Sequence, residues 1–297
     1  MSTNQGQGRA AGFSIAHITD THLGAQHRDF EPNFIALADE MNRVAPDLVI
    51  NTGDLTVNGT QEDADHLRAY ALHQQLTPAW RVLPGNHDIG DNPRAPGDVL
   101  NKPVTAQRLA RYRAVWGADF WGADAGEFRL IGLNAQLCGS DLAEEADQWD
   151  FLAQEVRALQ GRPLALFLHK PLFLAHPDEP EPTYRYVPLA PRLRLLDLVR
   201  TARLRLVATG HMHQHRMLQI GPVLHAWGPS SAFVLPGGFQ PTIGSKQIGY
   251  NLYHLDGDRV TAQVCVPGVL AQNDIIDFPA PYGSVRDILE GRAVYRP

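Results

Sequence analysis

The chain has 297 residues, of which 44% are hydrophobic and 20% charged, a composition that excludes a largely disordered protein. Its formal net charge of −6 gives no basic field for a polyanion, so no nucleic-acid partner is expected. The two cysteines, Cys138 and Cys265, lie far apart, which excludes a disulfide framework and a cysteine-based zinc site.

The start of the chain shows no targeting signal. Residues 1–12 are polar and lack the apolar core of a signal peptide, and no apolar run in the chain is long enough to span a bilayer. We therefore expect a disordered leader over residues 1–12 on a cytoplasmic protein without a membrane span.

Apolar runs of strand length then alternate with segments of helical spacing, which favours a single α/β domain. Strands are predicted over residues 15–19, 47–52, 79–83, 127–134, 164–168 and 204–209. Helices are predicted over residues 32–44, 61–75, 105–115, 144–159 and 190–201. In the second and fifth helices the spacing predicts these buried residues: Leu67, Tyr70, Ala71, Leu193, Leu196 and Val199.

Two long stretches interrupt the alternation: residues 89–103 are rich in glycine, proline and aspartate, and residues 172–191 are rich in proline and acidic residues. Loops of this kind usually shape access to a site, so we expect both to border one. Beyond residue 213 the pattern changes to short strands, predicted over residues 216–220, 223–227, 248–255 and 259–266. The last two are joined by the hairpin signal Asp256-Gly257-Asp258.

These signals predict one domain over residues 13–266. Residues 267–297 carry little periodicity, and we expect a C-terminal extension that packs on the domain or on a second subunit. A homo-oligomer is therefore left open.

Polar side chains follow five of the predicted strands, at the point where each strand ends. They are Asp20, His22, Asp54, Asn86, His87, Asp88, His169, His211 and His213. Because the carboxyl ends of parallel strands open onto one edge of a sheet, we expect these residues to converge on one site. Asp20 and Asp54 taken alone could be turn residues, and His169 a core histidine; the joint pattern indicates a site.

All of these side chains except His87 and Asp88 form a candidate ligand set of two carboxylates, one amide oxygen and four imidazoles, without a thiolate. Such a set suits divalent or trivalent first-row ions such as Mn, Fe, Co or Zn. Seven ligands are too many for one tetrahedral ion, and they fit two ions about 3.5–4 Å apart that share a carboxylate.

This ordered set, which spans residues 15–213, resembles the calcineurin-like metallophosphoesterase superfamily. The resemblance implies a four-layer α-β-β-α sandwich with mixed sheets and two bound metal ions. It implies one ion on Asp20, His22, Asp54 and His213, and the other on Asp54, Asn86, His169 and His211. It also implies in-line attack on phosphorus by a metal-bound hydroxide, with His87 assisting the leaving oxygen and Asp88 orienting His87.

Val57, the third residue after Asp54, separates the chain from two subfamilies of this superfamily. Purple acid phosphatases carry a tyrosine at that position, and Ser/Thr protein phosphatases an aspartate. The motif Gly53-Asp54-Leu55-Thr56 and the compact length are instead similar to the bacterial class III cyclic-nucleotide and glycerophosphodiester phosphodiesterases. Lys170 follows His169 where cyclic-nucleotide enzymes often carry a second histidine; it either meets a substrate phosphate or is solvated.

We therefore expect a phosphodiesterase for a small phosphodiester of the cyclic-nucleotide or glycerophosphodiester type. A phosphomonoesterase or nucleotide pyrophosphatase is the alternative, with Arg94, Lys102 or Arg185 holding a terminal phosphate. A non-catalytic metal-binding module is a third interpretation, against which the complete ligand set argues. The substrate-binding residues stay unassigned, although four side chains lie near the expected edge of the pocket: His27, His176, His225 and Trp227.

Overall fold

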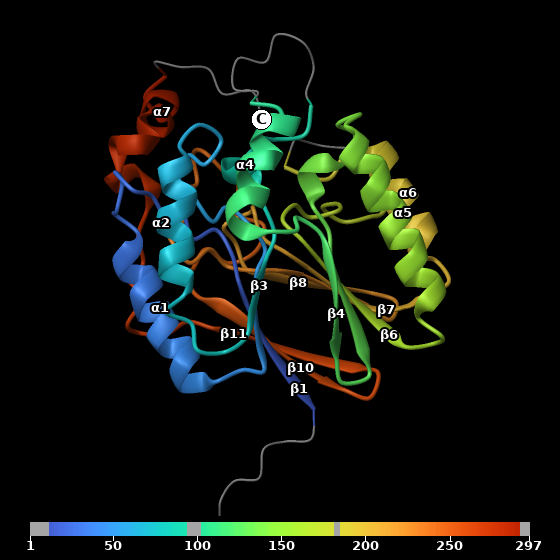
Figure 1. Cartoon of the computed structure of the whole chain (residues 1–297). Helices are drawn as coiled ribbons and strands as arrows, with labels where there is room; N and C mark the ends of the chain where they lie inside the picture. The colour runs from blue at the N-terminus through green and yellow to red at the C-terminus, as the bar shows by residue number, and fades with distance from the viewer. Residues whose placement is uncertain (1–11, 94–101, 181–184, 292–297) are drawn as a thin grey trace, which may run out of the picture.

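Two β-sheets form the centre of the computed structural model, which describes residues 12–93, 102–180 and 185–291 (Figure 1). The first sheet has the strand order β11-β10-β1-β2-β3. Its strands are Phe13–Ile18 (β1), Leu48–Asn51 (β2), Trp80–Val82 (β3), Tyr250–Asp256 (β10) and Arg259–Cys265 (β11). Strands β1, β2 and β3 run parallel, whereas β10 pairs antiparallel with both β1 and β11.

The second sheet has the strand order β4-β5-β6-β7-β9-β8. Its strands are Trp121–Ala125 (β4), Phe128–Gly132 (β5), Pro163–Leu168 (β6), Arg203–Thr209 (β7), Arg216–Ile220 (β8) and Val223–Trp227 (β9). The four central strands are parallel, and β4 and β8 pair antiparallel at the two edges.

Helices cover the outer face of each sheet, as Figure 1 shows. Those on the first sheet are Glu31–Val44 (α1) and Asp63–His73 (α2), and those on the second are Ala143–Ala158 (α5) and Leu189–Val199 (α6). The remaining elements are Asn86–Ile89 (α3), Ala106–Trp116 (α4), Pro279–Leu289 (α7) and the 3₁₀ turns Ala135–Leu137 and Ile275–Asp277. This confirms the four-layer α-β-β-α sandwich with mixed sheets.

Apolar side chains fill the three spaces between the four layers. Ile15, Phe167 and Tyr253 lie between the two sheets, in a cluster to which both contribute. Phe34 of α1 and Leu72 of α2 pack these helices against the first sheet. An equivalent apolar cluster packs α5 and α6 against the second sheet. Burial of large apolar side chains contributes about 1.5–3 kcal/mol each, so these clusters fix the sheet edges that carry the polar loops.

The predicted buried face of α2 is wrong. Leu67 is 60% exposed and Tyr70 is 37% exposed, whereas His66 and His73 are completely buried. The imidazole of His73 is satisfied in the core, because Nδ1 donates to the carbonyl of Ala69 and Nε2 accepts from the amide of Asn51. The buried face of α2 therefore carries two histidines, and the predicted apolar residues lie on the solvent side.

Helix α6 shows a similar departure from the prediction, since Leu193 is 44% exposed. Arg192 is completely buried in its place, and its guanidinium donates to the carbonyl of Leu172 at 2.9 Å. The long loop after β6 is thus tied to the helix that follows it.

The part of the C-terminal segment that the structure describes packs against the domain. Ile275 and Val285 form a buried cluster with Phe30, Ala232 and Phe233. The predicted division at residue 266, the disordered leader, the cytoplasmic location and the homo-oligomer all stay predictions. Within the described ranges, every helix is too short or too polar to cross a membrane.

Candidate metal centre

The loops after β1, β2, β3, β6 and β7 meet at one edge of the paired sheets. Backbone hydrogen bonds join these loops, because Asp20 N donates to the Gly53 carbonyl at 2.9 Å and Gly210 N donates to the His169 carbonyl at 2.8 Å. Two glycines permit this close approach. A β-carbon at Gly85 would overlap the carboxylate of Asp54, and one at Gly210 would overlap the hydroxyl of Thr19.

The candidate ligands form two groups. In the first, His213 Nε2 lies 3.3 Å from Asp20 Oδ1 and 3.3 Å from His22 Nε2. Each of these side chains offers a ligand atom within 4.8 Å of the others, and all three are buried.

The second group is built around Asp54 and His169. His169 Nε2 lies 3.3 Å from Asp54 Oδ2, 3.1 Å from His211 Nδ1 and 3.2 Å from Asn86 Oδ1. The other neighbour of Asp54 Oδ2 is His22 Nε2, at 4.0 Å, which belongs to the first group. Asp54 therefore stands between the two groups.

The arrangement fits bound cations. Asp20 Oδ1 is buried and has no hydrogen-bond partner, which is costly for a carboxylate oxygen unless a cation faces it. Of the eight non-glycine residues with positive φ in the described ranges, five are candidate ligands: Asp20, His22, Asp54, His211 and His213. Backbone strain of this kind concentrates at functional sites, where the surrounding structure maintains it.

Hydrogen bonds on the outer side of the imidazoles orient them. His169 Nδ1 donates to the Thr52 carbonyl at 3.0 Å, and His213 Nδ1 donates to the Phe233 carbonyl at 2.8 Å. Because a carbonyl can only accept, each ring has a proton on Nδ1, which leaves Nε2 to face the site and to bind a metal as the neutral imidazole. This is the tautomer that a metal ligand requires.

Burial and charge set the ionisation of the site. Burial opposes ionisation of Asp54, but the imidazoles of His169, His87 and His22 outweigh it and hold the pKa of that carboxyl well below its usual value. Burial likewise lowers the pKa of His169, yet the carboxylates around it, Asp54 first, raise it to about 9. The two residues thus form a charged pair in the absence of metal.

Asp88 has a different task from the one expected. Its buried carboxylate accepts hydrogen bonds from the backbone N–H groups of Leu55, Thr56 and Gly85, at 3.1, 2.9 and 2.8 Å. The ring of His87 instead donates from Nδ1 to the carbonyl of Val57 at 2.8 Å. Asp88 therefore fixes the loop that carries Asp54, and Val57 orients His87.

A cavity of about 230 Å³ opens at the candidate ligands. Its polar part includes His87 and Arg185, and its other wall is apolar, built by Phe233, Leu235, Phe239, Ile275 and Val285 with Tyr282. The sequence did not predict this apolar wall, because its residues lie in two stretches, 233–239 and 275–285, that carry little periodicity and meet only in the folded chain.

The other expected pocket residues lie elsewhere. Lys170 neither lines this cavity nor is solvated: it is buried and forms an ion pair with Asp91. Lys102 is exposed and, with His27 and His176, does not line the cavity. Arg94 lies outside the described residues.

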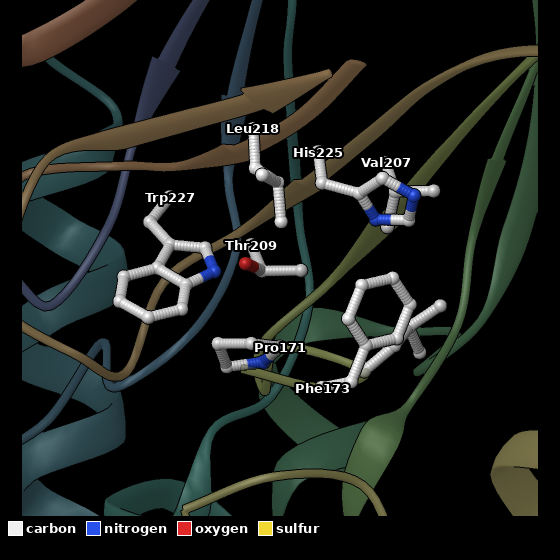
Figure 2. A pocket seen from close by; sticks show the side chains of 8 residues that line it. Pro171, Phe173, Val207, Thr209, Leu218, His225 and Trp227 are labelled. Carbon is white, nitrogen blue, oxygen red and sulfur yellow. The ribbon is translucent and has the colours of Figure 1, made fainter. Parts of the chain in front are cut away.

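His225 and Trp227 line a second, much smaller pocket on the sheet (Figure 2). Its volume is about 10 Å³, room for a single water molecule. The buried hydroxyl of Thr209 points into this pocket and has no hydrogen-bond partner (Figure 2). His225 and Trp227 therefore do not line the larger cavity at the candidate ligands.

Comparison with known proteins identifies the family of the chain. The sequence model of the calcineurin-like phosphoesterase family matches residues 13–215. A 3',5'-cyclic-nucleotide phosphodiesterase of Nostoc is 28% identical over 230 residues, which cover 74% of this chain and 79% of that protein. A human serine/threonine-protein phosphatase is 29% identical over 163 residues, 52% of this chain and 48% of that protein.

Among solved structures, a dimetal phosphatase from Danio rerio shares the fold, with a TM-score of 0.57 at 13% identity. The likeness covers 85% of this chain and 95% of the other.

Proposed function

Because this chain belongs to the calcineurin-like phosphoesterase family and is a metal-dependent phosphoester hydrolase, we propose that it hydrolyses a small phosphodiester with two metal ions. The observation that carries this proposal is the position of Asp54, whose Oδ2 lies 4.0 Å from His22 Nε2 and 3.3 Å from His169 Nε2. One carboxylate between two ligand groups is the arrangement that two ions sharing a bridging ligand require.

The candidate ligands divide into two sets that share Asp54. The first ion is assigned to Asp20, His22, Asp54 and His213, and the second to Asp54, Asn86, His169 and His211. When bound, two such ions supply Lewis-acid charge for the phosphoryl oxygens and activate water at neutral pH. Mn, Fe, Co and Zn all suit this mixed nitrogen and oxygen set.

His87 is proposed as the acid that assists the leaving oxygen. It lines the cavity, and its backbone N–H donates to Asp54 Oδ1 at 2.8 Å, so the residue is fixed beside the bridging carboxylate. Its Nδ1 is bonded to the Val57 carbonyl, which leaves Nε2 as the nitrogen able to give a proton.

The cavity wall favours a diester over a monoester. A diester carries a second organic group, and the apolar side chains around Phe233 offer a surface against which that group can pack. The Nostoc relative named as a cyclic-nucleotide phosphodiesterase matches most of this chain, whereas the match to the human phosphatase covers about half. Arg185 supports the alternative, a phosphomonoesterase or nucleotide pyrophosphatase, because it lines the same cavity and a guanidinium can hold a terminal phosphate.

The proposal is tested with bis(p-nitrophenyl) phosphate and p-nitrophenyl phosphate. The purified full-length protein is chelated, reloaded separately with Mn, Fe, Co or Zn, and assayed on both esters. We expect diester turnover that disappears on chelation and returns with metal, which would justify a screen of cyclic nucleotides and glycerophosphodiesters. Preference for the monoester would establish the alternative, and a reloaded protein that cleaves neither ester would favour the binding module.

A further inference from the structure

Tyr282, in the C-terminal segment, lines the cavity at the candidate ligands. It lies in α7, where the backbone departs from helical geometry at Ala280 (φ −108°, ψ 116°) and at Tyr282 itself (φ −106°, ψ 30°). The side chain lines the same cavity as Asp54 and His87. Residue 282 is 260 positions from His22 in sequence, so only the folded chain brings the two together.

The tyrosine hydroxyl is bonded to a candidate ligand. Tyr282 Oη lies 2.8 Å from Nδ1 of His22, and the two rings meet edge to face with centroids 5.8 Å apart. The ring of His87 is also 5.8 Å from that of Tyr282. Tyr282 therefore contacts both the first ligand group and the proposed acid.

His22 differs from His169 and His213 in the group that holds its outer nitrogen. His169 and His213 each donate from Nδ1 to a backbone carbonyl of the domain, which fixes their tautomers. In His22 the same position is taken by a side-chain hydroxyl, and that hydroxyl belongs to the C-terminal segment. The orientation of this one ligand thus depends on how the segment packs.

The packing that holds Tyr282 is aromatic and close to the site. The ring of Phe233 lies with its centroid 5.2 Å from Tyr282 and 4.7 Å from His22, so it supports both. Phe233, Ile275 and Val285 belong to one buried apolar cluster, which seats the segment. Aromatic contacts of this kind contribute about 0.5–1.5 kcal/mol beyond the area they bury.

We propose that Tyr282 is a positioning residue for the metal centre: its hydroxyl accepts the Nδ1–H of His22 and keeps Nε2 of that ring directed at the first ion. The inference rests on the proposed function, because it assigns Nε2 of His22 to a metal. Partners of this kind stabilise the ligating tautomer and fix the ring, and removing one typically costs metal affinity without removing the ligand itself.

The test is Tyr282→Phe, which removes the hydroxyl and keeps the ring. Chelated full-length protein is titrated with Mn²⁺ by calorimetry, and turnover of bis(p-nitrophenyl) phosphate is measured on the same samples. We expect one of two ions to bind about 10- to 100-fold more weakly while the other is unchanged, with a loss in kcat larger than the change in KM.

Tyr253→Phe is the matched control. The hydroxyl of Tyr253 also bonds an imidazole, Nδ1 of His17 at 3.1 Å, and Tyr253 is fully buried, but His17 is not a candidate ligand. This variant should bind both ions as the unmodified protein does.

Each outcome decides a different question. If Tyr282→Phe binds both ions like the unmodified protein, the inference is overturned and the proposed function stands. If the unmodified protein binds no Mn²⁺, the titration is repeated with Zn²⁺ and Co²⁺; if none of these ions binds, both fall together. Should the variant fail to fold, ¹H–¹⁵N spectra of the zinc-loaded unmodified protein decide: a protonated Nδ1 on His22 supports the inference, and an unprotonated one contradicts it.

Discussion

Asp54 is the residue whose position supports a two-ion site, and its substitution tests that assignment. Asp54→Asn keeps the shape of the side chain but removes its charge, so neither ligand group retains the carboxylate they share. We expect the bound metal, measured by elemental analysis after desalting, to fall from two ions toward none. Loss of only one ion would show that Asp54 belongs to one group and does not bridge.

His87 can be separated from the ligands by comparing metal content with turnover. His87→Ala removes the proposed acid, and we expect both ions to remain while turnover of a diester with an alkoxide leaving group falls about 10²- to 10⁴-fold, the usual contribution of general acid catalysis. Esters with better leaving groups should lose less activity, since their departing oxygen needs no proton. Turnover equal to that of the unmodified protein would remove the assigned role.

The candidate ligands were predictable from the sequence because each follows an apolar run that forms a strand. The partners that orient them were not. Val57 holds His87 and Thr52 holds His169 through backbone carbonyls, which every residue possesses and no motif marks. Tyr282 gives no local signal either, because it lies among prolines and glycine in a kinked helix and acquires its place through tertiary packing.

At the scale of the elements, the loops of the site depend on how closely they approach one another. A β-carbon at Gly210 would overlap the Thr19 hydroxyl and come within 2.8 Å of Asp20 Oδ2. That carboxylate oxygen accepts from the backbone N–H of His211 at 3.0 Å, so the loops after β1 and β7 are joined where the clash would fall.

We therefore expect Gly210→Ala to displace Asp20, weaken the first ion and lower the free energy of unfolding by about 1–3 kcal/mol, the usual cost of overpacking. Denaturant unfolding and metal analysis give the two readouts. Gly237→Ala is the control, since a β-carbon there meets no atom within 4 Å. If both variants behaved alike, close approach at Gly210 would not be what holds the loops.

The strands of the structure show which elements a local sequence pattern can predict and which it cannot. Strands β8 and β9 match the predicted ranges, and the predicted hairpin joins β10 to β11, with Asp256 paired to Arg259. The edge strand β4 was missed because its sequence, Trp121-Gly122-Ala123-Asp124-Ala125, lacks an apolar run. Its place is set by tertiary contact instead: the indole N–H of Trp121 donates to the carbonyl of Val82, across to the other sheet.

For the molecule as a whole, buried neutral histidines make stability depend on pH. Burial lowers the pKa of His73 to about 4 and that of His17 to about 3, the latter against the opposing charge of Asp20. In the unfolded chain both titrate near 6.5, so below that pH the unfolded state binds more protons than the folded state. Stability is therefore fully present above pH 6.5 and is lost as the pH falls toward 4.

His73→Gln isolates one such contribution, because it leaves an uncharged polar side chain in the core where the imidazole stood. We expect the variant to be less stable at pH 7 and its stability to fall less steeply between pH 6.5 and 4, by up to about 1.4 kcal/mol per pH unit. Urea unfolding of the chelated protein at several pH values measures this slope. His254→Gln, at an exposed position of β10, controls for the substitution itself. If the curves for His73→Gln and the unmodified protein ran parallel over this range, the acid sensitivity would have to arise from the other buried histidines.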